Sequence, residues 1–280
     1  MSIQERARLF RALHTESILV LPNVWDAGSA VVMAQAGAPA LATTSGGVAW
    51  SLGYGDSQQI GRDAMIDAVR RIASAVEVPV SADIEGGYGI SPAEVAATVE
   101  AVVSAGAVGI NLEDSHAASR TLFGIEEQAD RIRAARDAAE RSGLPDLVIN
   151  ARTDVYLFPN GPLDERFEAL LRRAEAYEKS GADCLFVPGL VDIPVLRELV
   201  ARSALPVNVM AGPGAPSISD LSGAGVRRVS VGTTIAQAAY TVAQTATAEL
   251  LQKGTYSSLE SALGFAAIDS LFTTGPVSGG

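Results

Sequence analysis

Residues 103–113, VSAGAVGINLE, carry the local pattern that decides the fold: a helix ends in small residues and a glycine, and an apolar strand follows at once. The pattern recurs at residues 34–44 (AQAGAPALATT), 178–188 (EKSGADCLFVP) and 222–232 (SGAGVRRVSVG). Because glycine has no Cβ, we expect a left-handed backbone conformation just past each helix. The glycines concerned are Gly37, Gly106, Gly181 and Gly225.

Short apolar runs alternate with Ala-rich stretches of helical period along the whole chain. The expected strands are residues 18–21, 40–43, 80–83, 109–112, 147–150, 184–187, 207–210 and 228–231. Alternating strands and helices are typical of βα units, and strands that are apolar throughout are buried on both faces of a parallel sheet. We therefore predict an α/β fold, a (β/α)8 TIM barrel with an N-terminal helix and a C-terminal helical extension.

The expected N-terminal helix covers residues 3–13, and the helix of the extension covers about residues 259–271. No shift in composition marks a second domain. We divide the chain into the barrel with its N-terminal helix (1–256), the helical extension (257–273) and a tail (274–280). The tail is rich in Gly, Pro and Ser, which predicts a flexible segment.

Composition excludes several classes of function. Lys and Arg number 21 against 32 Asp and Glu, a formal charge of −11, whereas nucleic-acid binders need clustered cations. A single cysteine, Cys184, cannot form an intrachain disulfide, and the charged N-terminus does not resemble a signal peptide. The most apolar long stretch, residues 233–251, is interrupted by glutamines and threonines. We expect a cytoplasmic protein that binds neither membranes nor nucleic acids.

Polar residues gather where the expected strands end, which is where barrel enzymes place their chemistry. Ser45-Gly46-Gly47 follows the second strand, and its hydroxyl and backbone N–H groups could hold an anion. Asp83 and Glu85 follow the third strand and Glu113 the fourth. Three carboxylates so close together need a cation or shifted pKa values. Oxygen ligands without nearby His or Cys favour Mg²⁺, with Mn²⁺ as an alternative.

Two interpretations of these charges stay open. The acids could instead pair with Arg152 and loop arginines in a ring of salt bridges. Arg152 itself follows the fifth strand, where its planar guanidinium suits a substrate carboxylate, but it could equally be a partner of Asp154 or Glu113.

Other reactive residues narrow the chemistry. Neither lysine, Lys179 or Lys253, lies at a strand end, which excludes a Schiff-base aldolase of the usual kind. His14, in the first helix, is expected at the surface, whereas His116 directly follows the fourth-strand acids. Cys184 begins a strand and is expected to be a core residue.

Six motifs together resemble the isocitrate lyase/phosphoenolpyruvate mutase superfamily, over residues 21–234. They are LPNVWDAGSA (21–30), TTSGG (43–47), GYGD (53–56), ADIEGGYG (82–89), GINLEDS (109–115) and NARTD (150–154). The resemblance implies a Mg²⁺-dependent enzyme that handles a 2-oxo acid or its enolate. It also implies a homo-oligomer, a dimer or a dimer of dimers, in which subunits exchange the C-terminal helix.

The resemblance also assigns roles position by position. Asp83 would bind the metal directly, and Glu85 and Glu113 would hold it largely through water. The substrate's carboxylate and carbonyl oxygen would lie against Ser45, Gly46 and Gly47, with further contacts from Arg152 and Asn208. The implied catalytic residues are Asp56, Glu113 and Arg152.

Three departures from the superfamily pattern bear on the reaction. Asp83-Ile84-Glu85 replaces the usual Asp-x-Asp, residues 115–123 lack the cysteine of the lyases, and residues 187–189 lack a Glu or His. Our first hypothesis is cleavage or decarboxylation of a 2-oxo dicarboxylate through a metal-stabilised enolate. The alternatives are a 2-oxo acid binding protein without turnover and a hydrolase of phosphonopyruvate-type C–P bonds.

Overall fold

The computed structural model describes residues 1–158 and 163–273, and the predicted tail at 274–280 lies outside them. Within this part of the chain, nine parallel strands form one sheet in the order β1-β9-β8-β7-β6-β5-β4-β3-β2. They are β1 (Leu19–Leu21), β2 (Asn23–Val24), β3 (Leu41–Thr43), β4 (Val80–Asp83), β5 (Gly109–Glu113), β6 (Val148–Arg152), β7 (Cys184–Phe186), β8 (Val207–Met210) and β9 (Arg228–Ser230). The predicted TIM barrel is confirmed.

The barrel closes at Pro22, which divides its first strand into β1 and β2. The strand expected at residues 18–21 is found as β1, and Pro22 directly follows it; proline has no N–H to donate to a neighbouring strand. β1 therefore pairs with β9, and β2 pairs with β3. Asn23 bridges the break: its Oδ1 accepts from the N–H groups of Val231 (2.8 Å) and Gly232 (2.9 Å), and its Nδ2 donates to the carbonyl of Thr43 (3.1 Å).

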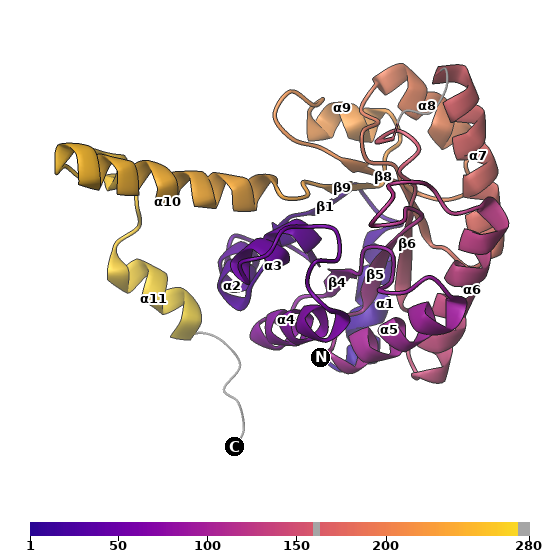
Figure 1. The fold of residues 1–280 in the computed structure, drawn as a ribbon, viewed down its shortest axis with the longest axis horizontal. Coiled ribbons are helices and arrows are strands. Elements are labelled where there is room, and N and C mark those ends of the chain that lie inside the picture. The colour runs from indigo at the N-terminus through magenta and orange to yellow at the C-terminus, as the bar shows by residue number, and fades with distance from the viewer. Residues whose placement is uncertain (159–162, 274–280) are drawn as a thin grey trace.

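Helices surround the sheet and cover its ends (Figure 1). They are α1 (Ile3–Leu13), α2 (Ala27–Gln35), α3 (Ser45–Ser51), α4 (Arg62–Ala75), α5 (Pro92–Ser104), α6 (Ile125–Arg141), α7 (Leu163–Lys179), α8 (Ile193–Arg202), α9 (Ile218–Gly223), α10 (Thr234–Lys253) and α11 (Phe265–Thr273), with a short 3₁₀ helix at Ser257–Leu259. The four motif glycines have φ between 89° and 97°, so the expected left-handed turns are confirmed.

The C-terminal helices leave the barrel (Figure 1). α10 runs outward, and α11 turns back to contact α2. Val20, at the centre of β1, is 38% exposed, and Leu251 and Phe265 on the outward helices are 82% and 84% exposed. In the part of the chain described here, no helix combines the length and apolarity needed to cross a membrane. The division of the chain at residue 256 stays a prediction.

The N-terminal helix α1 closes the bottom of the barrel and brings His14 inside. The expectation that His14 lies at the surface is wrong, since His14 is only 6% exposed to solvent. Its ring packs edge-on against Phe10, its Nδ1 lies 2.7 Å from the Phe10 carbonyl, and its Nε2 faces Nη1 of Arg228 at 3.4 Å. The helix pattern alone does not reveal a contact made 214 positions along the chain.

The burial of His14 predicts a specific loss of stability in acid. Burial, reinforced by Arg228, lowers the pKa of His14 from 6.5 to about 4. Between pH 6.5 and pH 4, His14 is therefore protonated in the unfolded chain but neutral in the folded chain. The contribution of His14 to the free energy of unfolding is complete above pH 6.5 and is lost as the pH falls toward 4. We expect His14 to account for about 2 kcal/mol of the stability lost between pH 7 and pH 5.

The measurement is urea unfolding of the wild type and His14→Gln at both pH values. Glutamine keeps hydrogen-bonding groups but does not titrate, so the variant should lose about 2 kcal/mol less than the wild type over this interval. Equal losses in the two proteins would contradict the assignment.

Candidate active site

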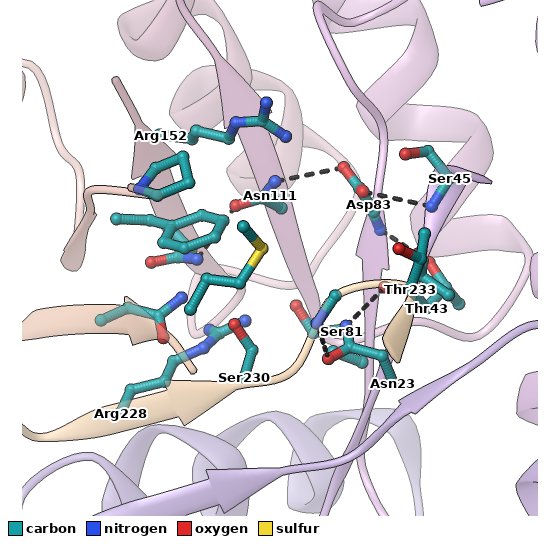
Figure 2. A pocket seen from close by; sticks show the side chains of 18 of the residues that line it. Asn23, Thr43, Ser45, Ser81, Asp83, Asn111, Arg152, Arg228, Ser230 and Thr233 are labelled. Atoms are coloured by element: carbon teal, nitrogen blue, oxygen red, sulfur yellow. Dashed lines mark hydrogen bonds between the residues drawn. The ribbon is translucent and has the colours of Figure 1, made fainter. Parts of the chain in front are cut away.

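A cavity of about 210 Å³ opens among the carboxyl ends of the strands (Figure 2). Five of the residues predicted for the site line it: Ser45, Asp56, Asp83, Arg152 and Asn208. A smaller cavity of about 70 Å³ lies against Ser45, Asp56 and Arg152 as well, and it adds Glu85 and Glu113. The fold thus brings the predicted residues to one mouth of the barrel.

Asp83, the last residue of β4, is held from three directions (Figure 2). Its Oδ2 accepts from the N–H of Ser45 at 3.2 Å, and its Oδ1 accepts from Nδ2 of Asn111 at 3.1 Å and from the N–H of Glu85 at 3.2 Å. Its own N–H donates to Oγ1 of Thr43. Such a carboxylate is fixed in position before any ligand arrives.

Glu85 is a buried acid without a cationic partner in the described chain. Its backbone turns through a left-handed conformation (φ 49°), which directs the side chain back into the mouth. Its Oε2 accepts from the N–H of Gln58 (2.8 Å) and its Oε1 from the Tyr88 hydroxyl (3.2 Å). Burial, followed by the charges of Asp83, Asp56 and Glu113, raises the pKa of Glu85 to about 8.

Arg152 connects the two neighbouring strand ends. Its Nη1 lies 2.9 Å from Oε2 of Glu113, and its Nε and Nη2 donate to the two oxygens of Asp154 at 2.6 and 3.0 Å. The ion-pair interpretation left open by the sequence is therefore realised, although the guanidinium still borders the cavity. Burial raises the pKa of Glu113, and Arg152 opposes that rise.

The donor set fits a hard divalent cation bound largely through water. Among the described residues, no three His, Cys, Asp or Glu side chains form a ready-made metal cage. Asp83 nevertheless offers a fixed carboxylate, and Glu85 needs either a proton or a cation to neutralise its charge. Mg²⁺ characteristically binds one or two carboxylates and keeps several waters. The oxygen-only mouth suits that arrangement, and Mn²⁺ accepts the same ligands.

The Ser45-Gly46-Gly47 segment forms the first turn of α3, where backbone N–H groups have no preceding turn to bond. Added Cβ atoms would not fit: at Gly46 the atom would lie 2.8 Å from Cγ2 of Thr233, and at Gly47 it would lie 2.7 Å from Cγ2 of Thr44. Close packing of the Thr233 and Thr44 side chains against this turn therefore requires both glycines.

The sequence did not single out a chain of amides inside the barrel. Nδ2 of Asn150 donates to Oδ1 of Asn111 at 3.0 Å, and Asn111 in turn donates to Asp83. Both asparagines lie in segments that were interpreted as apolar strands. An asparagine within an otherwise apolar strand is the sequence signal for such a chain, because burying an amide without a hydrogen-bond partner is unfavourable. Asn208 is the second residue of β8, so it lies away from the strand end.

Behind the mouth, a buried network fixes Asp154. Asp114 accepts from the N–H of Asp154 through Oδ1 at 3.0 Å, and through Oδ2 from Arg173 (2.9 Å) and the Tyr177 hydroxyl (2.7 Å). Asp154 also accepts from the Ser115 hydroxyl at 2.7 Å. These contacts orient the Asp154 carboxylate, which in turn orients Arg152. The partners on α7, Arg173 and Tyr177, are far from Asp114 in the sequence, so sequence patterns do not predict them.

The loop at residues 115–123 folds over this region. Ser115 and Leu122 form an isolated antiparallel bridge, and the ring of His116 stacks on Phe123 with centroids 3.7 Å apart. His116 and Arg120 both border the smaller cavity. The loop thus places two ionisable groups beside the acids.

Comparison with known proteins assigns the family. The family model described as phosphoenolpyruvate phosphomutase matches residues 10–251. The chain belongs to this family. The predicted membership of the isocitrate lyase/phosphoenolpyruvate mutase superfamily is thereby confirmed.

Relatives within the superfamily differ in activity. The 2-methylisocitrate lyase of Escherichia coli strain K12 is 33% identical over 216 residues, covering 74% of this chain and 70% of that protein. A solved Burkholderia cenocepacia J2315 protein described as a candidate phosphonomutase is 45% identical, covers 87% of this chain and 99% of its own, and has a TM-score of 0.83.

Oxaloacetate acetylhydrolase, solved with its product oxalate, is 25% identical and covers 97% of this chain and 95% of its own, with a TM-score of 0.86. The same enzyme has been solved with the inhibitor 3,3-difluorooxalacetate. Together the family and its relatives support an enzyme of the lyase type that acts on small carboxylates.

Proposed function

We propose that this protein is a Mg²⁺-dependent lyase-type enzyme that breaks the bond β to the carbonyl of a small 2-oxo acid or 2-oxo dicarboxylate. The observation that carries the proposal is the convergence of Asp83, Arg152 and the Ser45 turn on one cavity. These groups offer, respectively, an anionic oxygen ligand, a cation and neutral hydrogen-bond donors. A 2-oxo acid needs all three, because it combines a carboxylate with a polarisable carbonyl.

The substrate's 2-oxo end lies against α3 in this proposal. The hydroxyl of Ser45 and the N–H groups of Gly46 and Gly47 bind its carboxylate and carbonyl oxygens. Arg152 contacts the substrate through the N–H groups that Glu113 and Asp154 leave over. Asn208, which also lines the cavity, supplies a further polar contact.

Asp83 holds Mg²⁺, with Glu85 and Glu113 acting largely through water, and Mn²⁺ is the alternative ion. When bound, the ion supplies Lewis-acid stabilisation of the negative charge that develops on the carbonyl oxygen. Asp56 borders both cavities and is placed to accept or return a proton. The Tyr88 hydroxyl stays protonated, because burial raises its pKa, and it keeps Oε1 of Glu85 in place.

The loop at residues 115–123 distinguishes this chain from lyases that use a cysteine there. Ser115 is bonded to Glu113 and Asp154, so it orients acids and is not a free nucleophile. We assign protonation of the product to His116, which borders the smaller cavity. The missing cysteine also favours the second candidate, a 2-oxo acid binding protein without turnover.

A homo-oligomer with exchanged C-terminal helices accounts for the exposed apolar surface. Val20 is uncovered because α10 does not pack over β1, and the side chains of α10 and α11 are themselves exposed. In this arrangement the C-terminal helices of a second copy of the chain cover Val20, and the C-terminal helices of the first copy cover the same surface on the second. We propose a dimer of dimers.

Asp83→Asn should weaken Mg²⁺ binding by more than the 10–100-fold typical of outer-shell partners, because it removes an anionic ligand and keeps the side chain's shape. Isothermal titration of the purified protein with Mg²⁺ measures this. Asp67→Asn, an exposed acid on α4, is the matched control and should bind as the wild type does. Wild-type affinity in Asp83→Asn would remove Asp83 from the metal site.

Proton NMR of the protein with Mg²⁺ and a panel of 2-oxo acids and their aldol adducts, oxaloacetate first, tests the reaction. We expect pyruvate, acetate or glyoxylate to form faster than in the enzyme-free and Asp83→Asn controls, and the product names the bond broken. Mg²⁺-dependent line broadening without product would favour the binding protein, and phosphate release from phosphonopyruvate would favour C–P hydrolysis.

Light scattering after size exclusion tests the assembly. The wild type should have about four times the chain mass of 28.9 kDa, and the double variant Leu251→Asp/Phe265→Asp should be smaller, because charges replace the most exposed apolar side chains of the extension. Leu9→Asp, on α1, should leave the wild-type mass. A wild type of 28.9 kDa would disprove the exchange.

A further inference from the structure

Arg228 lies at the floor of the large cavity as a buried cation without an anionic partner. The residue is 2% exposed, yet it borders the same cavity as Asp83 and Arg152 (Figure 2). In residues 1–158 and 163–273 it forms no ion pair, and its Nε has no hydrogen-bond partner. Its recorded contacts are Nε2 of His14 at 3.4 Å and the face of the Phe10 ring, 5.8 Å from the ring centroid.

The charge of Asp83 raises the pKa of Arg228, but the two residues form no ion pair, and the other groups around Arg228 are neutral near pH 7. His14 has a pKa of about 4, and burial raises the pKa of the Cys184 thiol to about 12. Burial lowers the pKa of Arg228 itself to about 10, so the guanidinium still carries its charge. Burying a charge without a counter-ion is strongly unfavourable, and an anion that enters the cavity would relieve this.

Arg228 is the deep end of one continuous wall of the cavity. Arg152, Phe186, Asn208 and Arg228 are register partners on the neighbouring strands β6, β7, β8 and β9, so their side chains face the same side of the sheet. Both polar atoms of Asn208, next to Arg228, are buried without a partner. This wall therefore offers unused donors beside an unpaired charge.

The other arginines near the mouth are less suited to a second anion. The charge of Arg152 is already matched by Glu113 and Asp154. Arg120 is exposed on the loop at residues 115–123, where water already solvates it. An incoming carboxylate consequently gains most at Arg228.

We propose that Arg228, with Asn208, binds the carboxylate at the end of the substrate remote from the 2-oxo group, and so makes the enzyme selective for 2-oxo dicarboxylates. The inference rests on the proposed function, which places the 2-oxo end against Ser45. A cavity of about 210 Å³ has room for a four- or five-carbon diacid, since one water occupies about 30 Å³.

Three probes separate the two ends of the ligand. Oxalate occupies the Ser45 and metal end and lacks the remote carboxylate. 3,3-Difluorooxaloacetate has both ends, and its 4-methyl ester keeps the length but removes the remote charge. Dissociation constants are measured by isothermal titration at saturating Mg²⁺.

Arg228→Met removes the charge and keeps an apolar stem against Phe10. We expect it to bind difluorooxaloacetate about 10- to 100-fold more weakly than the wild type, the range for losing a hydrogen bond between charged groups, and oxalate within about threefold. The wild type should prefer the acid over the ester by a similar factor, and Arg228→Met should not discriminate between them.

Arg227→Met is the matched control, because Arg227 is the exposed neighbour on the same strand edge, and Arg120→Met tests the competing loop site. Both should bind all three probes as the wild type does. Loss of the acid preference in Arg120→Met but not in Arg228→Met would overturn the proposal. If Arg228→Met does not fold, the comparison of acid and ester in the wild type and in Arg228→Lys decides: a wild type that binds both equally contradicts the proposal.

The same titrations distinguish failure of this inference from failure of the proposed function. Mg²⁺-dependent oxalate binding without any acid preference would remove the role of Arg228 and leave the 2-oxo acid site standing. No Mg²⁺-dependent binding of any probe would overturn both.

Discussion

A carboxylate at the end of a barrel strand must be solvated, bonded or paired, and meeting that requirement at Asp83 organises the whole mouth. Donors reach it from the first turn of α3 and from Asn111 on β5. The turn that carries this donor packs closely against Thr233 and Thr44, because Gly46 and Gly47 have no Cβ. The amide of Asn111 is in turn held by Asn150. The polar groups around Asp83 therefore follow from the need to satisfy one partly buried carboxylate.

Charge is unevenly distributed along the cavity, and this distribution indicates which ligands the cavity would bind. Glu85 is an acid without a cation at the mouth, and Arg228 is a cation without an anion at the floor, among the residues that the structure describes. Arg152, between them, is balanced by its two carboxylates. A divalent cation at one end and an elongated anion reaching the other would neutralise both excesses. Neither ligand alone satisfies the cavity, which is why metal and substrate binding should reinforce each other.

The sequence was sufficient wherever a local rule acts. Glycine after a helix, apolar strands and polar strand ends depend on near neighbours, and these predicted the barrel and the gathering of Asp83 with Arg152. The effect of Pro22 on pairing depends on the strands on either side of it, β9 and β3, which come together only when the barrel closes. His14 and Arg228 meet across 214 positions, and each looked ordinary in its own helix or strand. Such contacts arise only from closure of the barrel, which no local pattern encodes.

The outward path of α10 links the assembly to the mouth. The helix begins at Thr234, two residues after Gly232. The N–H of Gly232 donates to Asn23 at the barrel's closing point, and its φ of 55° redirects the chain outward. Thr233, at the same bend, borders the cavity, and its Cγ2 occupies the space that a Cβ on Gly46 would need. In the proposed assembly, a partner subunit that holds α10 would therefore also fix Thr233, which packs on the Ser45-Gly46-Gly47 turn. The bend at Gly232 and Thr233 therefore determines two things at once: the outward direction of α10, and the position of Thr233 at the cavity.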